Sequence, residues 1–189
     1  MKKRIEIIEV GPRDGLQNQS AILSTEDKVA MINKLLDAGA RRLEVASFVN
    51  PARVPQMADA EGVLAALPKR DDVIYVGLVL NGRGLDRALN TQVDEIGVVA
   101  VATDAFGLRN QKQTWRESVA VSVDVIERAR KAGRRAQATI SVAFGCPFEG
   151  EVPLARVSEM ARGIAKAGPQ EIAVADRVVV GVPAQVKEM

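Results

Sequence analysis

The sequence predicts an α/β protein in which helices cover a parallel sheet. Short runs rich in β-branched residues alternate with longer segments of helical period along all 189 residues. Parallel strands need crossovers of a dozen or more residues, and the helical segments supply them. Because 47% of the residues are hydrophobic, the chain can bury one sizeable core, and we expect a single domain over residues 1–189.

Six strands are predicted, and each ends in glycine, proline or polar residues. They are residues 5–10, 42–48, 72–80, 95–102, 137–144 and 171–175.

Three helices carry clear start and stop signals, with a capping residue or proline before them and a glycine after them. They run between Ser24 and Gly39, between Thr114 and Gly133, and between Pro153 and Gly168. Glu117, three residues after Thr114, completes a capping box.

Polar residues that follow successive strands favour a barrel. Six β/α units would satisfy an open doubly wound sheet, whereas a (β/α)8 barrel needs eight units and about 250 residues. No Rossmann or P-loop glycine pattern is present. The polar residues at or after the strand ends are Arg13, Asp14, Ser47, Asn50, Asn81, Thr103, Asp104, Cys146 and Asp176. Functional groups that converge from many strand ends are typical of a barrel, so we predict a TIM-type barrel represented by about six units.

Composition excludes several classes of function. The 26 basic and 24 acidic residues nearly cancel and only 3% of residues are aromatic, so we expect no nucleic-acid partner. No apolar run approaches the 18 or so residues that span a bilayer, so no membrane partner is expected. Cys146 is the only cysteine, which favours a cytoplasmic location. Because the chain has no histidine, any mechanism that needs an imidazole is excluded for this polypeptide.

The segment GPRDG after the first predicted strand is a candidate for chemistry. Gly11 and Gly15 can adopt conformations closed to other residues, which suits a tight loop above the strand. Arg13 presents a planar, permanently charged fork suited to a carboxylate or an enolate, and Asp14 offers an oxygen ligand of the kind that Mg²⁺ or Mn²⁺ accepts. The alternative is a turn that contains only a loop salt bridge.

Each of the other candidate site residues can be interpreted in two ways. Glu44 inside the second predicted strand is either an acid–base group or the partner of a cation such as Arg13. Cys146 can be a nucleophile, but we interpret it as a buried structural residue because no histidine can activate it. Asp176 either binds substrate or pairs with Arg177. Residues 104–111 are predicted as a loop that closes on a substrate or is simply exposed.

Four motifs occur in order along the chain: VGPRDGLQNQ, VASFVNPARVPQMAD, SVAFGCPFEGEVP and ADRVVVGVP. Together they resemble the 3-hydroxy-3-methylglutaryl-CoA lyase family, metal-dependent lyases built on a TIM barrel. The resemblance implies metal-assisted retro-Claisen cleavage of an acyl-CoA substrate, 3-hydroxy-3-methylglutaryl-CoA, into acetoacetate and acetyl-CoA, with Mg²⁺ or Mn²⁺ as the cofactor. It also places the reaction in leucine degradation and ketone body metabolism.

The resemblance assigns roles to five residues. It implies that Arg13 stabilises the enolate of acetyl-CoA and that Asp14 binds the metal. It places Glu44 in the polar network of the catalytic site, and Gln17 and Asp176 among the substrate-binding residues.

The sequence also departs from the family pattern. The family has an H-x-H pair, an asparagine and a cysteine-bearing glycine-rich loop on later units, and none of these is present. Asp176-Arg177 stands where the family has Asp-Thr, and Val178-Val179 stands where it has Ile-Gly. We therefore expect an incomplete chain that binds metal poorly by itself. A truncated non-catalytic module, or a related lyase for another acyl-CoA, is the alternative, and association into a homo-oligomer stays open.

Overall fold

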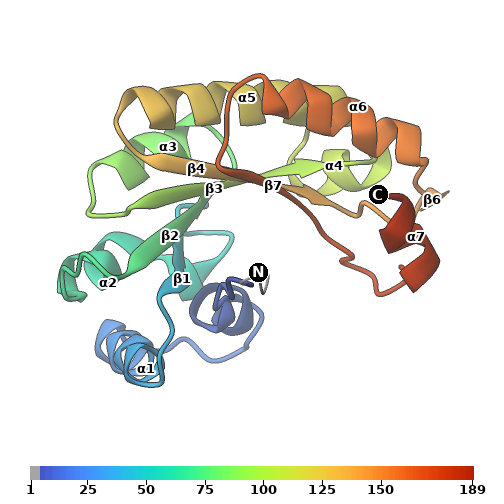
Figure 1. Cartoon of the computed structure of the whole chain (residues 1–189). Coiled ribbons are helices and arrows are strands. Elements are labelled where there is room, and N and C mark those ends of the chain that lie inside the picture. Colours follow the sequence, from blue (N-terminus) through green and yellow to red (C-terminus); the bar gives the residue numbers. More distant parts are fainter. Residues whose placement is uncertain (1–4) are drawn as a thin grey trace. The chain divides into compact units, whose positions relative to one another are not determined.

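The computed structural model describes residues 5–189 as strands that alternate with helices (Figure 1). A five-stranded sheet contains, in this order, β1 (Arg42–Ser47), β2 (Ile74–Val79), β3 (Glu95–Val101), β4 (Arg135–Ser141) and β7 (Glu171–Val174). A separate antiparallel pair contains β5 (Gly145–Cys146) and β6 (Gly150–Glu151). The helices are η1 (Gly11–Gly15), α1 (Thr25–Asp37), η2 (Pro55–Met57), α2 (Ala60–Ala66), α3 (Gly82–Leu89), α4 (Asp104–Asn110), α5 (Trp115–Lys131), α6 (Leu154–Ala165) and α7 (Pro183–Glu188).

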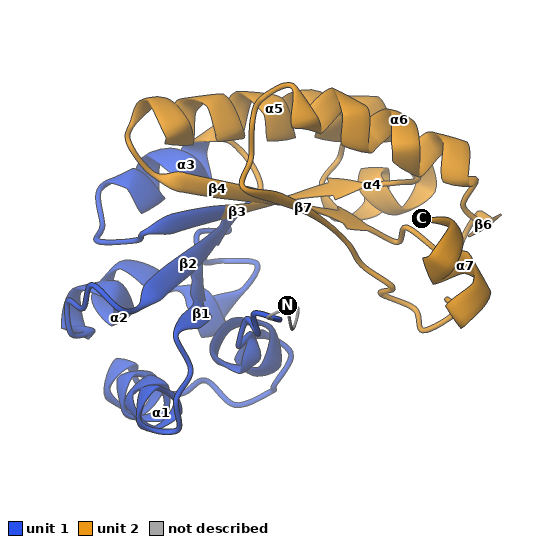
Figure 2. Cartoon of the chain, in the orientation of Figure 1, with its two compact units in different colours: residues 1–79, 83–96 blue, residues 80–82, 97–189 orange. Residues whose placement is uncertain are grey.

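The chain divides into two compact units, and the boundary falls within β3 (Figure 2). Unit 1 comprises residues 1–79 and 83–96, and unit 2 comprises residues 80–82 and 97–189. Each unit has its own parallel strand pairing, β1 with β2 in unit 1 and β4 with β7 in unit 2. The single domain expected for residues 1–189 stays a prediction.

In unit 1, β1 is buried along its whole length and carries a bulge. The register places Glu44 opposite Val76 and Ala46 opposite Gly77, so Val45 is the extra residue between them. Helix α1 begins as predicted, with Ser24 accepting a hydrogen bond from the Asp27 amide. The bulge matters for the site because it reorients Glu44 relative to the residues that follow it.

The strand predicted over residues 5–10 is wrong except at one residue. Glu9 forms an isolated parallel bridge with Leu43: the Glu9 amide donates to the Arg42 carbonyl at 2.9 Å, and the Glu44 amide donates to the Glu9 carbonyl at 2.8 Å. This register would pair residues 5–7 with the turn that precedes β1 rather than with a strand. Accordingly, Ile5 and Ile7 are 85% and 80% exposed.

In unit 2, α5 and α6 lie side by side over one face of β4 and β7 (Figure 1). The predicted capping box of α5 is confirmed: Thr114 Oγ1 accepts from the Glu117 amide, and Glu117 Oε2 accepts from the Thr114 amide. Both partners lie within one turn of the helix, which is why the sequence alone predicted them.

The loop predicted over residues 104–111 is instead helix α4. Asp104 opens the helix, and its Oδ1 atom accepts a hydrogen bond from the Trp115 amide at 2.8 Å. Gly107 lies inside α4 and packs against the turn that follows the helix, where a Cβ would collide with the Gln113 carbonyl oxygen. The glycine therefore permits a close approach rather than a break in the helix.

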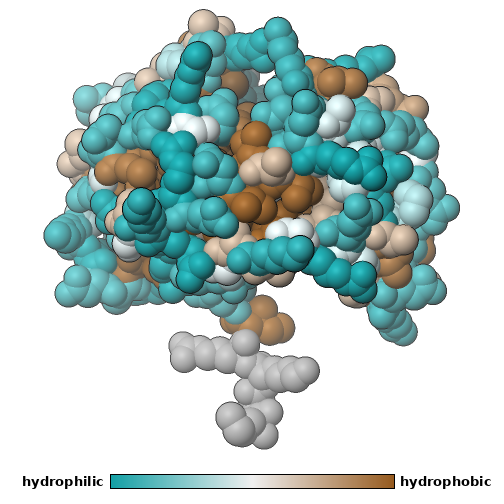
Figure 3. Space-filling model, turned by 90° about the horizontal axis from the view of Figure 1, so that it is seen from above, coloured by the Kyte–Doolittle hydropathy of each residue, from teal (hydrophilic) through white to brown (hydrophobic). Residues whose placement is uncertain are grey.

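Most of the face shown in Figure 3 is covered by hydrophilic side chains, with hydrophobic ones between them. Among the helices formed by residues 5–189, none combines the length and the apolar composition of a transmembrane span.

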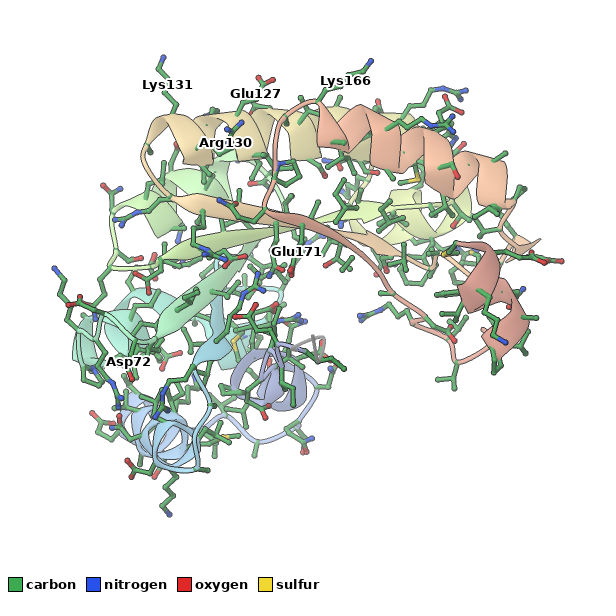
Figure 4. All side chains as sticks on the ribbon, in the orientation of Figure 1. Asp72, Glu127, Arg130, Lys131, Lys166 and Glu171 are labelled. Atoms are coloured by element: carbon green, nitrogen blue, oxygen red, sulfur yellow. The ribbon has the colours of Figure 1, made fainter. Side chains whose placement is uncertain are left out.

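The glycines after α5 and α6 provide a matched test of the helix ends. Gly133 and Gly168 have φ of +76° and +70°, so alanine at either position should cost about 1–2 kcal/mol of unfolding free energy. A Cβ at Gly133 meets nothing within 4 Å, whereas one at Gly168 collides with the guanidinium of Arg130. Arg130 projects from α5 (Figure 4) and donates to the Ala167 carbonyl at 2.7 Å. Gly168→Ala should therefore lose about 0.5–1.5 kcal/mol more than Gly133→Ala in urea unfolding. Equal losses would show that the hydrogen bond of Arg130 contributes nothing.

Candidate active site

The candidate site begins with a single helical turn in unit 1, residues Gly11–Gly15. The amides of Arg13, Asp14 and Gly15 all point at the Val10 carbonyl, at 3.1, 2.7 and 3.5 Å. Pro12 is a buried residue of this turn, near its start, where the fixed φ of proline suits a helix. The bridge at Glu9 therefore leads within a few residues to a compact turn that carries Arg13 and Asp14.

The interpretation of Gly11 and Gly15 as residues in conformations closed to others is wrong. Neither has a positive φ. Gly11 is needed for space, because its amide donates to Glu9 Oε1 at 2.6 Å and a Cβ would lie 2.8 Å from the same atom. A Cβ at Gly15 would meet nothing within 4 Å. The turn is thus shaped by hydrogen bonds rather than by glycine backbone freedom.

Arg13 lies between two carboxylates. Its Nη1 atom donates to Asp14 Oδ1 at 2.8 Å, and its Nε atom donates to Glu44 Oε1. The Arg13 side chain is 13% exposed, and Glu44 as a whole is 7% exposed. Of the two interpretations of Glu44, the structure shows the pairing with Arg13, and this pairing leaves an acid–base role open.

The third nitrogen of the guanidinium is unused. Arg13 Nη2 has no hydrogen-bond partner among residues 5–189, while Nε and Nη1 are both engaged. A guanidinium held at two of its three nitrogens has little rotational freedom left, so Nη2 offers a donor in a defined direction. Such a donor is suited to an oxygen that gains negative charge.

The charges of the cluster have a defined balance. Burial raises the pKa of the Glu44 carboxyl above its ordinary value, the charge and hydrogen bond of Arg13 oppose that rise, and the charge of Asp14 adds to it. When both carboxylates are ionised, the three side chains carry one net negative charge. The cluster therefore favours an additional cation nearby.

Asp14 fits one position in the shell of a divalent cation. Its side chain is 41% exposed, and only Oδ1 is engaged, so Oδ2 is available as a hard oxygen ligand. In the part of the chain that the structure describes, no three His, Cys, Asp or Glu side chains gather closely enough to hold a metal ion. The residues present thus fit such an ion through one ligand.

The other two predicted site residues, Gln17 and Asp176, belong to different units. Gln17 lies two residues after the end of η1, and its Oε1 atom is buried without a hydrogen-bond partner. Asp176 belongs to unit 2, where Oδ1 accepts from the Val180 amide at 3.1 Å and Oδ2 from the Gly181 amide at 2.7 Å. The Gly181 amide is the main cause that holds the pKa of Asp176 below its ordinary value.

Cys146 is buried and accepts two hydrogen bonds. Thr103 Oγ1 donates to its sulfur at 3.1 Å, and the Phe148 amide donates at 3.4 Å. These contacts agree with its interpretation as a structural residue. Arg177 is exposed, and no carboxylate of the described residues pairs with it, so the alternative in which it neutralises Asp176 is not seen.

Sequence reasoning missed a second polar cluster in unit 1, formed by Lys28, Gln56 and Asp59. Lys28 Nζ donates to the Gln56 carbonyl at 2.6 Å and to Asp59 Oδ1 at 2.5 Å. The available signal was the position of Lys28, which lies on the buried stripe of α1, four residues before the buried Ile32. A lysine on a buried stripe needs a partner.

The two glycines of the turn should respond differently to alanine. Gly15→Ala should leave the unfolding free energy unchanged or raise it by up to about 1 kcal/mol, because the position is helical and open. Gly11→Ala should lower it by about 1 kcal/mol, because Glu9 must move and give up its hydrogen bond. Chemical denaturation of both variants checks this, and a larger loss at Gly15 would contradict it.

The pH dependence of stability should report on Glu44. Its pKa is raised on folding, so its contribution to stability is complete below its ordinary value of 4.5 and declines as the pH rises through the folded-state pKa. Between pH 4.5 and 7, wild type should therefore lose unfolding free energy relative to Glu44→Gln. Urea unfolding at both pH values measures this, with the exposed Glu26→Gln as control. If the difference in unfolding free energy between wild type and Glu44→Gln stays constant or changes in the opposite direction, the raised pKa of Glu44 is refuted.

Comparison with known proteins relates these features to a family. The HMGL-like family model matches residues 4–189. A Pseudomonas aeruginosa protein named 3-hydroxy-3-isohexenylglutaryl-CoA/hydroxy-methylglutaryl-CoA lyase is 38% identical over 96% of this chain and 60% of its own length. The crystal structure of the Bacillus subtilis HMG-CoA lyase matches with a TM-score of 0.95 and 35% identity, over 98% of this chain and 62% of that one.

A third match carries ligands. The structure of an HMG-CoA lyase from Acinetobacter baumannii in complex with coenzyme A and 3-methylmalate has a TM-score of 0.91 and 33% identity, over 97% of this chain and 60% of that one. The chain thus spans about three fifths of the length of these proteins. The matches confirm the predicted TIM-barrel-type fold class, and the chain belongs to the HMGL-like family.

Proposed function

We propose that this chain supplies the Arg13, Asp14 and Glu44 cluster of a carbon–carbon lyase that cleaves 3-hydroxy-3-methylglutaryl-CoA into acetoacetate and acetyl-CoA. Membership of the HMGL-like family and the names of its relatives support this reaction. The structure from Acinetobacter baumannii that contains coenzyme A supports an acyl-CoA as the substrate class. The observation that carries the proposal is the unused Nη2 donor of Arg13, which two carboxylates hold in place.

The reaction breaks the bond between C2 and C3 of the acyl group. The substrate hydroxyl loses its proton and becomes the ketone of acetoacetate, and the bonding pair moves toward the thioester as an enolate, which is then protonated to acetyl-CoA. Negative charge therefore develops on the thioester oxygen. A preorganised guanidinium donor aimed at that oxygen stabilises the transition state by about 3–4 kcal/mol, judging from single oxyanion donors in other enzymes.

Glu44 and Asp14 have separate tasks in this scheme. Glu44 holds the Nε atom of Arg13 from the buried strand, which orients the guanidinium without filling its Nη2 position. We assign one ligand of Mg²⁺ or Mn²⁺ to Asp14, whose Oδ2 atom is available. Lyases of this family are metal-dependent in general. When bound, such an ion would polarise the hydroxyl and carboxylate oxygens of the substrate.

Gln17 and Asp176 are proposed as substrate-binding residues. The buried, unpartnered Oε1 atom of Gln17 supports its role, because a ligand donor would satisfy it. For Asp176, the proposal rests on the family resemblance, since both of its oxygens accept backbone hydrogen bonds. A cytoplasmic location, as expected from the lone cysteine, and a homo-oligomeric assembly belong to the same proposal.

Arg13→Gln tests the proposed function in the longest form of the protein that cleaves the substrate. With Mg²⁺ or Mn²⁺ present, kcat should fall about 10²–10³-fold while KM changes little, because the lost donor acts in the transition state. Arg13→Lys should recover only part of this loss, since an ammonium cannot reproduce the fork. Arg87→Gln is the control, because Arg87 makes a bidentate pair with Glu61 elsewhere in unit 1.

Cleavage by Arg13→Gln within a few-fold of the parent would refute the role of Arg13. No cleavage by the parent with any acyl-CoA would favour the non-catalytic module. Cleavage of a different thioester would favour the related lyase.

A further inference from the structure

The motif segment PQMAD, residues 55–59, has no task in the proposed chemistry. It forms the 3-10 turn η2 and leads into α2. Met57 is buried, and its amide donates to the Val54 carbonyl at 3.1 Å. The two polar residues of the segment, Gln56 and Asp59, both take part in hydrogen bonds that leave the segment. The segment is thus a junction between distant parts of unit 1.

Lys28 of α1 is the first connection. It is 4% exposed, and its ammonium donates to the Gln56 carbonyl and to Asp59 Oδ1. Asp59 Oδ2 also accepts from Thr25 Oγ1 at 2.7 Å. Burial alone would raise the pKa of Asp59, but the hydrogen bonds from Lys28 and Thr25 hold it below its ordinary value. The amine is therefore a buried, satisfied anchor between α1 and η2.

The Gln56 side chain is the second connection. Its Nε2 atom donates to the Gln19 carbonyl at 2.8 Å. The Gln19 amide in turn donates to the Leu16 carbonyl at 3.1 Å, and Asn18 Nδ2 donates to the Asp14 carbonyl at 2.7 Å. Hydrogen bonds therefore link the buried amine to Gln56 and Gln56 to Gln19, and the neighbouring residues 18 and 19 bond back to the turn that bears Asp14.

We propose that Lys28 and Gln56 are positioning residues that clamp the segment 11–19. They thereby hold the Arg13 and Asp14 side chains in the positions that catalysis requires. The role assumes the proposed function, because it concerns the same two side chains. The clamp is needed because residues 18–21 are exposed and follow the turn without regular structure. Misplacement of a charged donor by about 1 Å can cost 10²-fold in rate.

A purely structural role predicts a different response of the segment 11–19 to substitution at Gln56. If Lys28 and Asp59 only joined α1 to α2, Gln56→Leu would leave this segment unchanged. The hydrogen bond from Lys28 would survive, because it goes to the Gln56 backbone carbonyl. Gln56→Leu removes only the bond to Gln19, and Lys28→Met removes the anchor. Gln92→Leu is a matched control, because Gln92 Nε2 donates to carbonyls at the other end of α2, those of Leu64 and Leu67.

Amide hydrogen exchange of this chain tests the clamp without any assay of activity. In Gln56→Leu, the amides of Arg13, Asp14 and Gln19 should exchange at least about tenfold faster, while those of β1 keep their rates. Gln92→Leu should leave those three amides within about twofold of wild type. Lys28→Met should speed the same amides, and Lys28→Arg should restore part of their protection.

Unchanged exchange at all three amides in Gln56→Leu would overturn the clamp, as would equal acceleration throughout unit 1. In a form that cleaves substrate, Gln56→Leu should lower kcat more than it raises KM. Loss of protection without any effect of Arg13→Gln on cleavage would instead leave the clamp intact and refute the proposed function.

Discussion

The pairing of Arg13 with Glu44 is the constraint on which unit 1 depends. A carboxylate in the middle of a buried strand costs several kcal/mol unless a cation and hydrogen bonds compensate for it. Arg13 supplies both, so the turn that carries it must lie over β1. The bridge at Glu9 makes this placement possible, because its two backbone hydrogen bonds flank Leu43 and bring the chain to within four residues of Arg13. One bridge thus does what a full strand was expected to do.

The hydrogen bonds among Arg13, Asp14 and Glu44 serve both the stability of the fold and the proposed chemistry. Asp14 and Glu44 both engage the guanidinium, and a simple loop salt bridge would need only one of them. Two acceptors restrict the rotation of the guanidinium and leave its Nη2 donor unpaired. They also give the cluster an excess negative charge, which burial makes unfavourable. A structure selected for stability alone would favour one matched pair. Here an additional cation would compensate for the excess negative charge, and an anionic oxygen would accept a hydrogen bond from Nη2.

Local signals in the sequence predicted the elements that depend on neighbours along the chain. The cap at Ser24 and the capping box at Thr114 lie within one turn of their partners, so their sequence patterns were sufficient. Residues 5–10 carry an equally good strand pattern, but strand formation requires a pairing partner in register, and β1 begins too late to supply it. Lys28 and Gln56 bond across 28 and 37 positions of the sequence, which no local pattern encodes.

The loop after β7 shows how a departure from the family sequence is accommodated. Val179 stands where the resemblance leads us to expect glycine, and its φ is +56°, a left-handed conformation that is strained for a β-branched residue by about 1–3 kcal/mol. The Asp176 carboxylate compensates, because it accepts hydrogen bonds from the Val180 and Gly181 amides. Gly181 has no room for a side chain, since a Cβ would lie 3.0 Å from Asp176 Oδ2 and from the Phe144 ring. The Asp176 carboxylate is therefore part of the structure of this loop, because each of its oxygens accepts a backbone hydrogen bond next to the strained Val179.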